Sequence, residues 1–454
     1  MLTVNACGMG LMTVSYSTTG NAKVVSISII IESPEYFDQL YSWLQNVGYT
    51  HFTFVIDCYY AHDYILHNAT RVNILKSYGE LIPRLPYMQQ NTTAQREAWI
   101  NSVTSDWKTY VGYVPKGIMD FVPDTFSANY AASLGYTYIQ GYCQDQWAVD
   151  AISEIGGWQE PYYASSSNIL VPDNSSQSTG LVVLPHATAD WIDSYTVWQG
   201  LQLHPMNVMQ QYDNNTAKAE AYFYALTNDT LLDCAPVSLA NIQFEWNYCV
   251  NYNDTTIVAN WLTGLIDHTA ISAQYQLMDY TDFVTWFRSA YPANPTYRVD
   301  FTSPYNSSDS IEWYWSTQYR VARVNGNVVS FVDYTIQAPD KYLTQVGYVN
   351  WAGPMQSDPD NCIDDSLFVT IAALGGGVMR YPAIKSQEFA YSGDLADFAS
   401  TYYSARTNAQ TTNSINIPAI AALTITAVAI ASLVVGLARG RRRIKKREKR
   451  NSTL

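Results

Sequence analysis

The stretch VVSISIII (24–31), followed by EYFDQLYSWLQNVG (35–48) and HFTFVI (51–56), decides the fold class. The first and third segments have the length of a strand and are apolar at most positions, which is typical of strands buried on both faces. The segment between them spaces its apolar residues three or four positions apart, as an amphipathic helix does. Two buried strands joined by a helix make a βα unit of a parallel sheet.

The same alternation continues outward to residue 246. Further strand-like runs are GELIPRL (79–85), TYVGYVPKGIM (109–119), YTYIQGY (136–142), LVVLPH (181–186) and NIQFEW (241–246), with helical segments at 91–107, 124–135 and 216–229. Seven strands of this kind predict an α/β fold, with a (β/α)7-like barrel over residues 24–270. A doubly wound sheet is the alternative.

The pattern changes after the barrel region. Residues 271–297 predict a helical bridge, and residues 298–398 alternate apolar and polar side chains in period two. The run VARVNGNVVSF (321–331) has the Asn-Gly turn of a hairpin, so we expect an all-β, sandwich-like domain here. Residues 399–416 are rich in Ser, Thr and Asn and predict a stalk.

The stretch Ile417–Ala438 is uncharged and predicts a C-terminal transmembrane helix. At about 1.5 Å per residue it reaches about 33 Å, enough to cross a hydrocarbon core of about 30 Å, although a buried globular helix is the alternative. The basic tail 439–454 follows, and the positive-inside rule places it in the cytoplasm. We therefore expect a single-pass protein of the cell membrane with its large N-terminal part outside. Residues 1–23 would be the remnant of an export signal or disordered.

The composition limits the partners. Only 14% of the 454 residues are charged, and the net charge is −14. Nine of the 25 Lys and Arg lie between 439 and 450, so the rest of the chain is more acidic than the net charge indicates. A body this acidic repels phosphate backbones, so no nucleic acid partner is expected, and the oligomeric state stays open. Seven Asn-x-Ser/Thr sequons before residue 417 suit a surface glycoprotein: Asn68, Asn91, Asn174, Asn214, Asn228, Asn253 and Asn306. Six cysteines without a CxxC pair are too few for a disulfide scaffold or a zinc cluster, although Cys234 and Cys249 could pair.

Candidate catalytic residues stand where the predicted strands end. In a parallel barrel, ligands bind at the carboxyl ends of the strands. The candidates at these ends are Glu32, Asp57, Asp120, His186 and Glu245. An acidic residue at such a position can instead be a helix N-cap, and His186 can be a buried, hydrogen-bonded imidazole.

Aromatic residues near the same ends suggest carbohydrate. Rings can stack on sugars, and the candidates are Trp147, Trp158, Tyr162, Trp191 and Trp246, although any single Trp can belong to the core. Asp120 and Glu245 would be the pair for glycosidic chemistry, one protonating the leaving oxygen and the other acting as nucleophile or base. The sequence contains no GxSxG, no HExxH and no P-loop, which disfavours the chemistries that those motifs serve.

The order of motifs resembles the polysaccharide deacetylase and glycoside hydrolase/deacetylase superfamily, whose fold is a (β/α)7 barrel. NVGYTHFTFVID (46–57) is similar to the family's second strand, and YGELIPRLPYMQQNTTAQREAWI (78–100) to its third strand and following helix. VPKGIMDFVPDTFSANYAASLGY (114–136) resembles its Pro-x-Gly segment, and GLVVLPHATADW (180–191) its late Leu-x-His motif. The resemblance covers about residues 24–260.

The departures from the family motifs concern its metal site. The resemblance implies two adjacent aspartates after the first strand, where this chain has Glu32 and Ser33. It also implies two metal-binding histidines four residues apart, at positions that are Leu85 and Gln89 here. We therefore expect no metal, no other cofactor and no metal-dependent deacetylation. In related glycosidases the catalytic carboxylates lie near the ends of the fourth and seventh strands, which correspond to Asp120 and Glu245.

Two functions remain open from the sequence. The first is a metal-independent surface hydrolase that acts on oligo- or polysaccharides with paired carboxylates on the barrel rim. The alternative is a catalytically silent protein with a deacetylase-like barrel that binds glycans or belongs to the surface layer. A solute-binding receptor would fit a single anchor but not the barrel pattern.

Overall fold

The structure is a computed structural model of the chain. It describes residues 22–85, 92–119, 125–142, 158, 160–169, 171–185, 204–212, 214–251, 255–305, 307–334, 372–374, 378–380, 389–390 and 392–398. The chain divides into two compact units, Met1–Leu395 and Ala396–Leu454, and nearly all of the described elements belong to the first.

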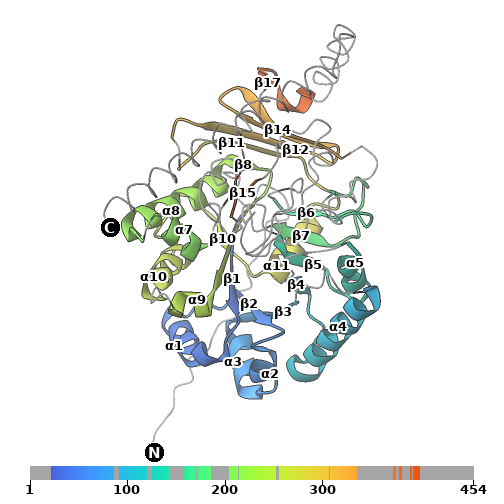
Figure 1. Ribbon diagram of the computed structural model, residues 1–454, viewed down its shortest axis with the longest axis vertical. Helices are drawn as coiled ribbons and strands as arrows, with labels where there is room; N and C mark the ends of the chain where they lie inside the picture. Colours follow the sequence, from blue (N-terminus) through green and yellow to red (C-terminus); the bar gives the residue numbers. More distant parts are fainter. Residues whose placement is uncertain are drawn as a thin grey trace, which may run out of the picture. The chain divides into compact units, whose positions relative to one another are not determined.

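The main sheet is parallel (Figure 1). Its long series of strands is β1 (Lys23–Ile31), β2 (Phe52–Asp57), β3 (Gly79–Arg84), β4 (Gly117–Met119), β5 (Tyr138–Tyr142), β7 (Val182–Pro185) and β9 (Ser238–Glu245). The spatial order is β1-β2-β3-β4-β5-β7, with β9 on the other side of β1. Two short strands are added, β10 (Gln276–Leu277) parallel to β1 and β6 (Tyr162–Tyr163) antiparallel to β7.

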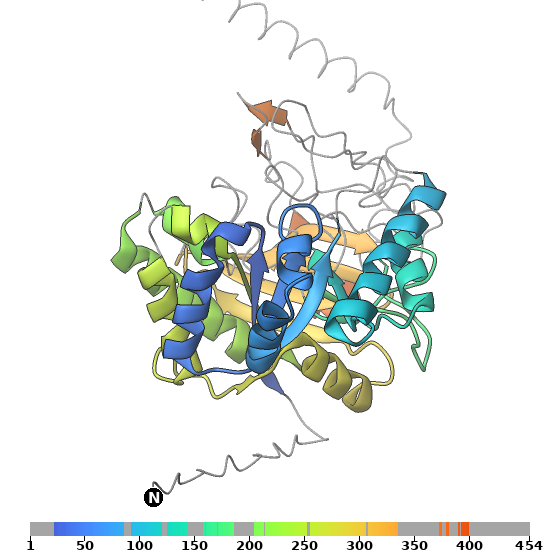
Figure 2. The ribbon, with the colours of Figure 1, turned by 90° about the horizontal axis from the view of Figure 1, so that it is seen from below.

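This strand order distinguishes the expected barrel from the alternative, a doubly wound sheet. A doubly wound sheet reverses its order at a switch point. Here the strands follow the chain without reversal, and β9 returns to pair with β1 along eight residues. The sheet is curled, with helices around its outer side (Figure 2). The predicted α/β class with a barrel-like sheet is therefore confirmed.

Most helices cover the outer side of this sheet, whereas the start of α11 contacts the barrel interior and η5 comes much later in the chain, after β17 (Phe389–Ala390). The helices of the described residues are η1 (Pro34–Tyr36), α1 (Phe37–Val47), α2 (His62–Leu66), α3 (Ala69–Tyr78), α4 (Thr93–Asp106), η2 (Trp107–Val111), α5 (Thr125–Ser133), α7 (Pro205–Gln211), α8 (Thr216–Asp233), α9 (Trp246–Asn251), α10 (Thr255–Ile266), α11 (Tyr280–Ala290) and η5 (Leu395–Asp397). In α1, the buried residues Phe37, Leu40, Trp43 and Leu44 form one face. The helix ends at Gly48, whose φ of 68° suits glycine.

The barrel interior contains a polar layer around Glu80. The Glu80 carboxylate accepts hydrogen bonds from the Thr53 hydroxyl at 2.8 Å, the Tyr138 hydroxyl at 3.0 Å and the Thr281 amide at 3.1 Å. Burial raises the pKa of Glu80, and these donors oppose the increase. Because each donor comes from a different element, the network ties β2, β5 and the start of α11 to β3.

A second polar layer closes the barrel between β7 and β9. Gln140 of β5 donates to Gln243 of β9 across the interior, and the Asn241 amide donates to the Pro185 carbonyl at 2.9 Å. Tyr280 donates its hydroxyl proton to Asn241. Side-chain hydrogen bonds therefore join β7 to β9.

An antiparallel sheet follows the barrel in sequence. Its strands, in spatial order, are β17 (Phe389–Ala390), β14 (Asn327–Asp333), β13 (Tyr319–Val324), β12 (Ser310–Trp315), β11 (Tyr297–Thr302) and β8 (Cys234–Ala235). A separate pair is formed by β15 (Ala372–Leu374) and β16 (Val378–Arg380). The described residues of 298–398 are mainly strands, and the all-β, sandwich-like domain stays a prediction.

The strand β8 links the two sheets. It pairs with β11 and directly precedes β9, so the antiparallel sheet joins the barrel where β9 begins. Tyr297 of β11 packs edge-on against Trp158 and donates to the Pro161 carbonyl at 2.6 Å. The expected bridge region, 271–297, contributes β10 and α11, both of which contact the barrel strands.

Two local expectations were wrong. The run 109–119 was expected to be one strand, yet only Gly117–Met119 is extended, because helix α4 continues into the π-helix η2 as far as Val111. The buried Trp107 indole donates to the Leu81 carbonyl at 3.1 Å and holds η2 against β3. Cys234 and Cys249 form no disulfide with each other, and they lie near opposite ends of β9.

The predicted membrane helix lies outside the described residues. Among the helices that are described, none combines the length and the apolar character needed to cross a bilayer. The stalk and the basic tail also lie outside the described ranges.

Candidate functional site

A charged cluster forms at the carboxyl ends of β1, β2 and β3. The register of β2 and β3 places Asp57 beside Arg84, and Glu32 follows the last residue of β1. The Arg84 guanidinium donates from Nη1 to Glu32 Oε1 and lies 3.5 Å from Asp57 Oδ2. Asn247 donates to the other Glu32 oxygen at 3.1 Å. We call Glu32, Asp57, Arg84 and Asn247 the rim cluster.

Asp57 also organises the loop after β2. Its Oδ1 atom accepts the backbone N–H groups of Tyr59 and Tyr60, both at 2.8 Å. Burial raises the pKa of Asp57, while these two N–H groups oppose the increase. One carboxylate oxygen thus holds a turn and the other faces Arg84, and Asp57 is not a helix N-cap, because α2 is preceded by Ala61 at its N-cap.

The turn held by Asp57 exposes two aromatic side chains. Tyr59 is 62% exposed and Tyr60 is 75% exposed. Their ring centroids are 6.1 Å apart, and the Tyr59 ring lies 5.8 Å from Trp99 of α4. Sequence reasoning missed these rings, although the Tyr-Tyr pair two residues after a strand-end carboxylate was a usable signal.

The structure places three of the five predicted catalytic residues. Glu32 and Asp57 are in the rim cluster. Glu245 is the last residue of β9 and shares the inward-facing series with Asn241 and Gln243. Asp120 and His186 lie outside the described residues, so the Asp120–Glu245 pair stays a prediction.

The predicted sugar-binding aromatics fall into different places. Trp158 and Tyr162 are fully buried, with ring centroids 5.5 Å apart, and belong to the core in this structure. Trp246 stacks on Trp43 at 5.5 Å and donates to the Tyr36 carbonyl at 3.1 Å. The remaining two, Trp147 and Trp191, lie outside the described residues.

The rim does not fit the metal ion that the family resemblance implies. The first implied ligand position, Glu32, is held by a guanidinium cation, and Leu85 is a buried apolar residue with no ligand atom. The other implied histidine position, Gln89, lies outside the described residues. A cation already bridges the carboxylates that a metal would need.

One group of possible metal ligands occurs elsewhere in the described part of the chain. His51, Asp279 and Asp282 place ligand atoms within 4.8 Å of one another. His51 directly precedes β2, whereas Asp57 ends it, so this group lies at the opposite end of the strand from the rim. Asp279 also caps α11, and burial together with the Glu80 and Asp282 charges raises its pKa to about 8.

Comparisons with known proteins give matches among solved structures. A protein from Mycobacterium smegmatis described as a polysaccharide deacetylase matches with a TM-score of 0.40 and 11% identity, over 61% of this chain and 93% of that one. An allantoinase matches with a TM-score of 0.39 and 10% identity, over 60% of this chain and 92% of that one. A CE4 family pseudoenzyme from Bacillus anthracis matches with a TM-score of 0.31 and 10% identity, over 59% of this chain and 66% of that one.

The matches include the deacetylase family that the sequence motifs resemble. No family model matches the chain, and no curated protein matches it. All three TM-scores are below 0.5, so these matches carry no argument about this chain. The functional argument therefore rests on the side chains.

Proposed function

We propose that the protein binds carbohydrate at the rim of a deacetylase-like barrel, without a metal ion. The observation that carries the proposal is the exposed pair Tyr59 and Tyr60, held by Asp57 directly beside the Arg84 ion pairs. Single exposed aromatics are ordinary on protein surfaces, but here two adjacent rings, tilted by 43°, extend from a turn whose backbone is held by one carboxylate. Such a pair of rings can pack against the apolar face of a sugar ring.

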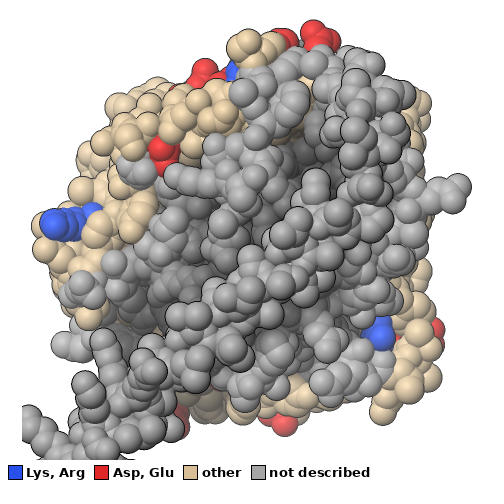
Figure 3. All heavy atoms as spheres, turned by 45° about the horizontal axis from the view of Figure 1, so that its top comes forward, with Lys and Arg blue, Asp and Glu red and all other residues tan. Residues whose placement is uncertain are grey.

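The rim cluster complements this platform. Arg84 and Asn247 carry N–H donors, and Glu32 and Asp57 carry acceptors, which is what ring hydroxyls require. Charged side chains stand singly among uncharged ones on the described part of the face in Figure 3. Together with the net charge of −14, this favours a neutral ligand over a phosphate-bearing one.

The same contacts favour binding over hydrolysis at the described part of the rim. A general acid or base must be able to reach the proton that it transfers. Glu32 is held by Arg84 and Asn247, and Asp57 is held by two backbone amides. These carboxylates act as positioning groups for the cation and the loop.

A glycan microarray probed with the full chain in EDTA tests the proposal. We expect neutral glycans to bind, and the double variant Tyr59→Ala/Tyr60→Ala to weaken that binding about tenfold or more, since each ring contributes about 0.5–1.5 kcal/mol. Tyr305→Ala is the matched control, because Tyr305 is 38% exposed and follows β11 of the other sheet. Equal binding by the rim variant and the wild type would refute the rim site.

Metal-independent hydrolysis remains a second candidate, favoured by the position of Glu245. This carboxylate is half-buried on an inward-facing position at the rim end of β9. If Glu245 and Asp120 form a catalytic pair, Glu245→Gln and Asp120→Asn each abolish release of reducing sugar while the fold persists. Chromatography of oligosaccharides incubated with wild type and variants separates this activity from binding alone.

We also propose that the protein is held at the cell surface by residues 417–438, with the barrel outside. The support is the uncharged sequence of this segment and the basic run after it. Deleting 417–438 should release the chain from the membrane fraction, and protease added to intact cells should cleave the full chain. Protection from external protease would contradict the proposed orientation.

A further inference from the structure

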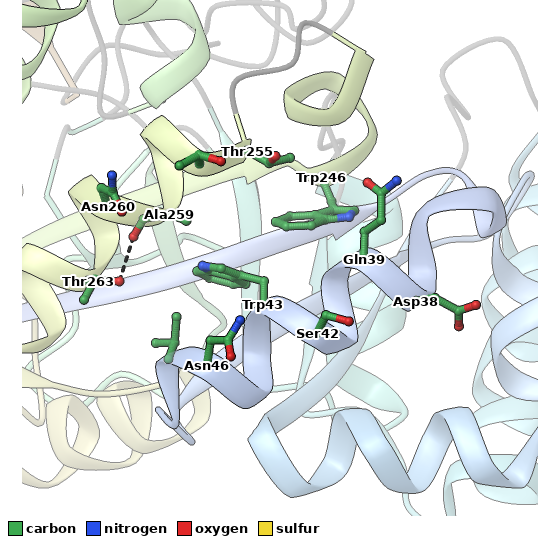
Figure 4. Close-up of a pocket in the computed structure, with 12 residues that line it drawn as sticks. Asp38, Gln39, Ser42, Trp43, Asn46, Trp246, Thr255, Ala259, Asn260 and Thr263 are labelled. Atoms are coloured by element: carbon green, nitrogen blue, oxygen red, sulfur yellow. Dashed lines mark hydrogen bonds between the residues drawn. The ribbon is translucent and has the colours of Figure 1, made fainter.

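A groove lies between helices α1 and α10, on the outside of the barrel (Figure 4). Its volume is about 660 Å³, within the usual range for sites that hold small molecules. Both helices present one side to it, and Trp246 at the start of α9 lies between them. The groove shares no residue with the rim cluster or with the exposed tyrosine pair.

The floor of the groove is formed by two largely buried indoles, Trp43 and Trp246, which are 9% and 4% exposed. Their ring centroids are 5.5 Å apart at an interplanar angle of 29°, and Figure 4 shows one ring stacked over the other between the helices. Phe52 and Phe244 pack against Trp43 at 5.4 and 6.3 Å. The hydrogen bond to Tyr36 fixes Trp246. The floor is therefore rigid before any ligand arrives, which lowers the entropic cost of binding.

One polar atom of the floor lacks a partner. Trp43 is 9% exposed, and its indole N–H is buried without a hydrogen bond to the described part of the chain. Figure 4 shows this nitrogen on the side of the ring that is turned toward α10. A buried donor without an acceptor is unfavourable, so an oxygen supplied by a ligand in the groove would stabilise it.

The walls of the groove carry neutral polar side chains. Gln39 and Asn46 come from α1, and Thr256 and Asn260 come from α10. These four side chains are exposed or half-buried, and none makes a side-chain hydrogen bond within the described ranges. Amides and hydroxyls both donate and accept, which matches the hydroxyl groups of a sugar.

The charge of the lining favours a neutral ligand. Asp38 is its one charged side chain, and Lys and Arg are absent from it. A phosphate-bearing ligand would find no cationic side chain here, although Thr255 and Thr256 bring the first turn of α10 to the groove. Two largely buried indoles with amide and hydroxyl walls instead suit a neutral sugar.

We propose that this groove is a second carbohydrate-binding site, which takes a neutral oligosaccharide on the Trp43–Trp246 floor. The groove adjoins the rim, because Trp246 follows Glu245 and Asn247 bonds Glu32. The proposal stands apart from the rim site, since its aromatic and amide side chains are different ones.

Titration calorimetry of the full chain with chitohexaose, cellohexaose and xylohexaose, one at a time, tests the groove. Gln39→Ala/Asn260→Ala removes two exposed amides and leaves the indoles in place. We expect it to weaken groove binding about thirtyfold, since each of the two lost hydrogen bonds contributes about 1 kcal/mol. Gln45→Ala is the matched control, because Gln45 is exposed on α1 but does not line the groove. Ala259→Trp fills the groove and should abolish binding there.

The rim variant Tyr59→Ala/Tyr60→Ala separates the two proposals. If the groove binds sugar, this variant retains binding that Ala259→Trp removes. Loss of all binding in the rim variant, with Ala259→Trp unchanged from wild type, overturns the groove site and leaves the rim site standing. The reverse pattern overturns the rim site and keeps the groove. If none of the three hexasaccharides binds, the groove proposal is overturned.

Discussion

Arg84 is the residue that neutralises the rim. It is 8% exposed and faces the buried Asp57 and the half-buried Glu32, for which it is the counter-charge. Arg84→Met should reduce the free energy of unfolding by about 3–5 kcal/mol, because removing one partner of a buried ion pair leaves an uncompensated charge. Urea unfolding followed by circular dichroism measures the loss.

Adding Glu32→Gln to Arg84→Met provides the control for that loss. The double variant removes one of the two stranded charges, so part of the lost stability should return. A loss below about 1 kcal/mol in Arg84→Met, similar to an exposed pair, would contradict the role assigned to this cation.

Glu160 makes stability depend on pH. Burial raises its pKa from 4.5 to about 8, so it is protonated in the folded chain at neutral pH and ionised in the unfolded chain. Its contribution is fully present below pH 4.5 and is lost as pH rises toward 8. Within this window each pH unit lowers the free energy of unfolding by up to about 1.4 kcal/mol.

The variant Glu160→Gln removes this titration but keeps an acceptor for the Leu239 amide. Its unfolding free energy should fall less steeply between pH 5 and 8 than that of the wild type, measured in urea at several pH values. Asp279, whose pKa is also about 8, contributes equally to both proteins. Identical slopes would show that Glu160 is ionised in the fold.

Sequence reasoning found part of the rim at this scale. Glu32, Asp57 and Glu245 stand at strand ends, and a strand end can be read from an apolar run. Arg84 was missed because it lies inside the run GELIPRL, and its two partners come from β1 and β2. Such pairing depends on register between strands, which a single strand does not reveal.

At the scale of elements, β4 depends on one glycine. A Cβ atom at Gly117 would lie 1.9 Å from the ring of Tyr138, which is the partner of Gly117 in β5. Gly117→Ala should therefore destabilise the fold by about 1–3 kcal/mol through overpacking, as measured by thermal or urea unfolding.

A double-mutant cycle with Tyr138→Ala checks the cause. In the Tyr138→Ala background the ring is gone, so Gly117→Ala should cost much less than in the wild type. Equal costs in both backgrounds would mean that the clash is not the reason for glycine at this position.

Most elements followed from periodicity, and the exception has a physical reason. The run 109–119 contains β-branched and aromatic residues that favour a strand. The helix nevertheless continues through Trp107 to Val111, because the Trp107 indole finds its acceptor on β3. A tertiary hydrogen bond thus outweighed the local preference for a strand.

At the scale of the whole molecule, the two sheets of the first compact unit should unfold together. The antiparallel sheet shares β8 with the barrel chain, and Tyr297 is buried against Trp158 and Pro161. We expect tryptophan fluorescence and circular dichroism to report one coincident urea transition. Two separate transitions would show that the sheets are independent domains, which the sequence alone suggested through its change of pattern at residue 298.

The central claim is that the rim binds carbohydrate through the exposed rings of Tyr59 and Tyr60 and the guanidinium of Arg84. Titration calorimetry of the full chain, with the glycan that the microarray selects and with EDTA present, tests this claim most directly. The account predicts binding that is unchanged by removal of metal, weakened by Tyr59→Ala/Tyr60→Ala, and followed by recovery of the intact glycan. Binding that requires Zn²⁺, or binding that the rim variant leaves untouched, would contradict it.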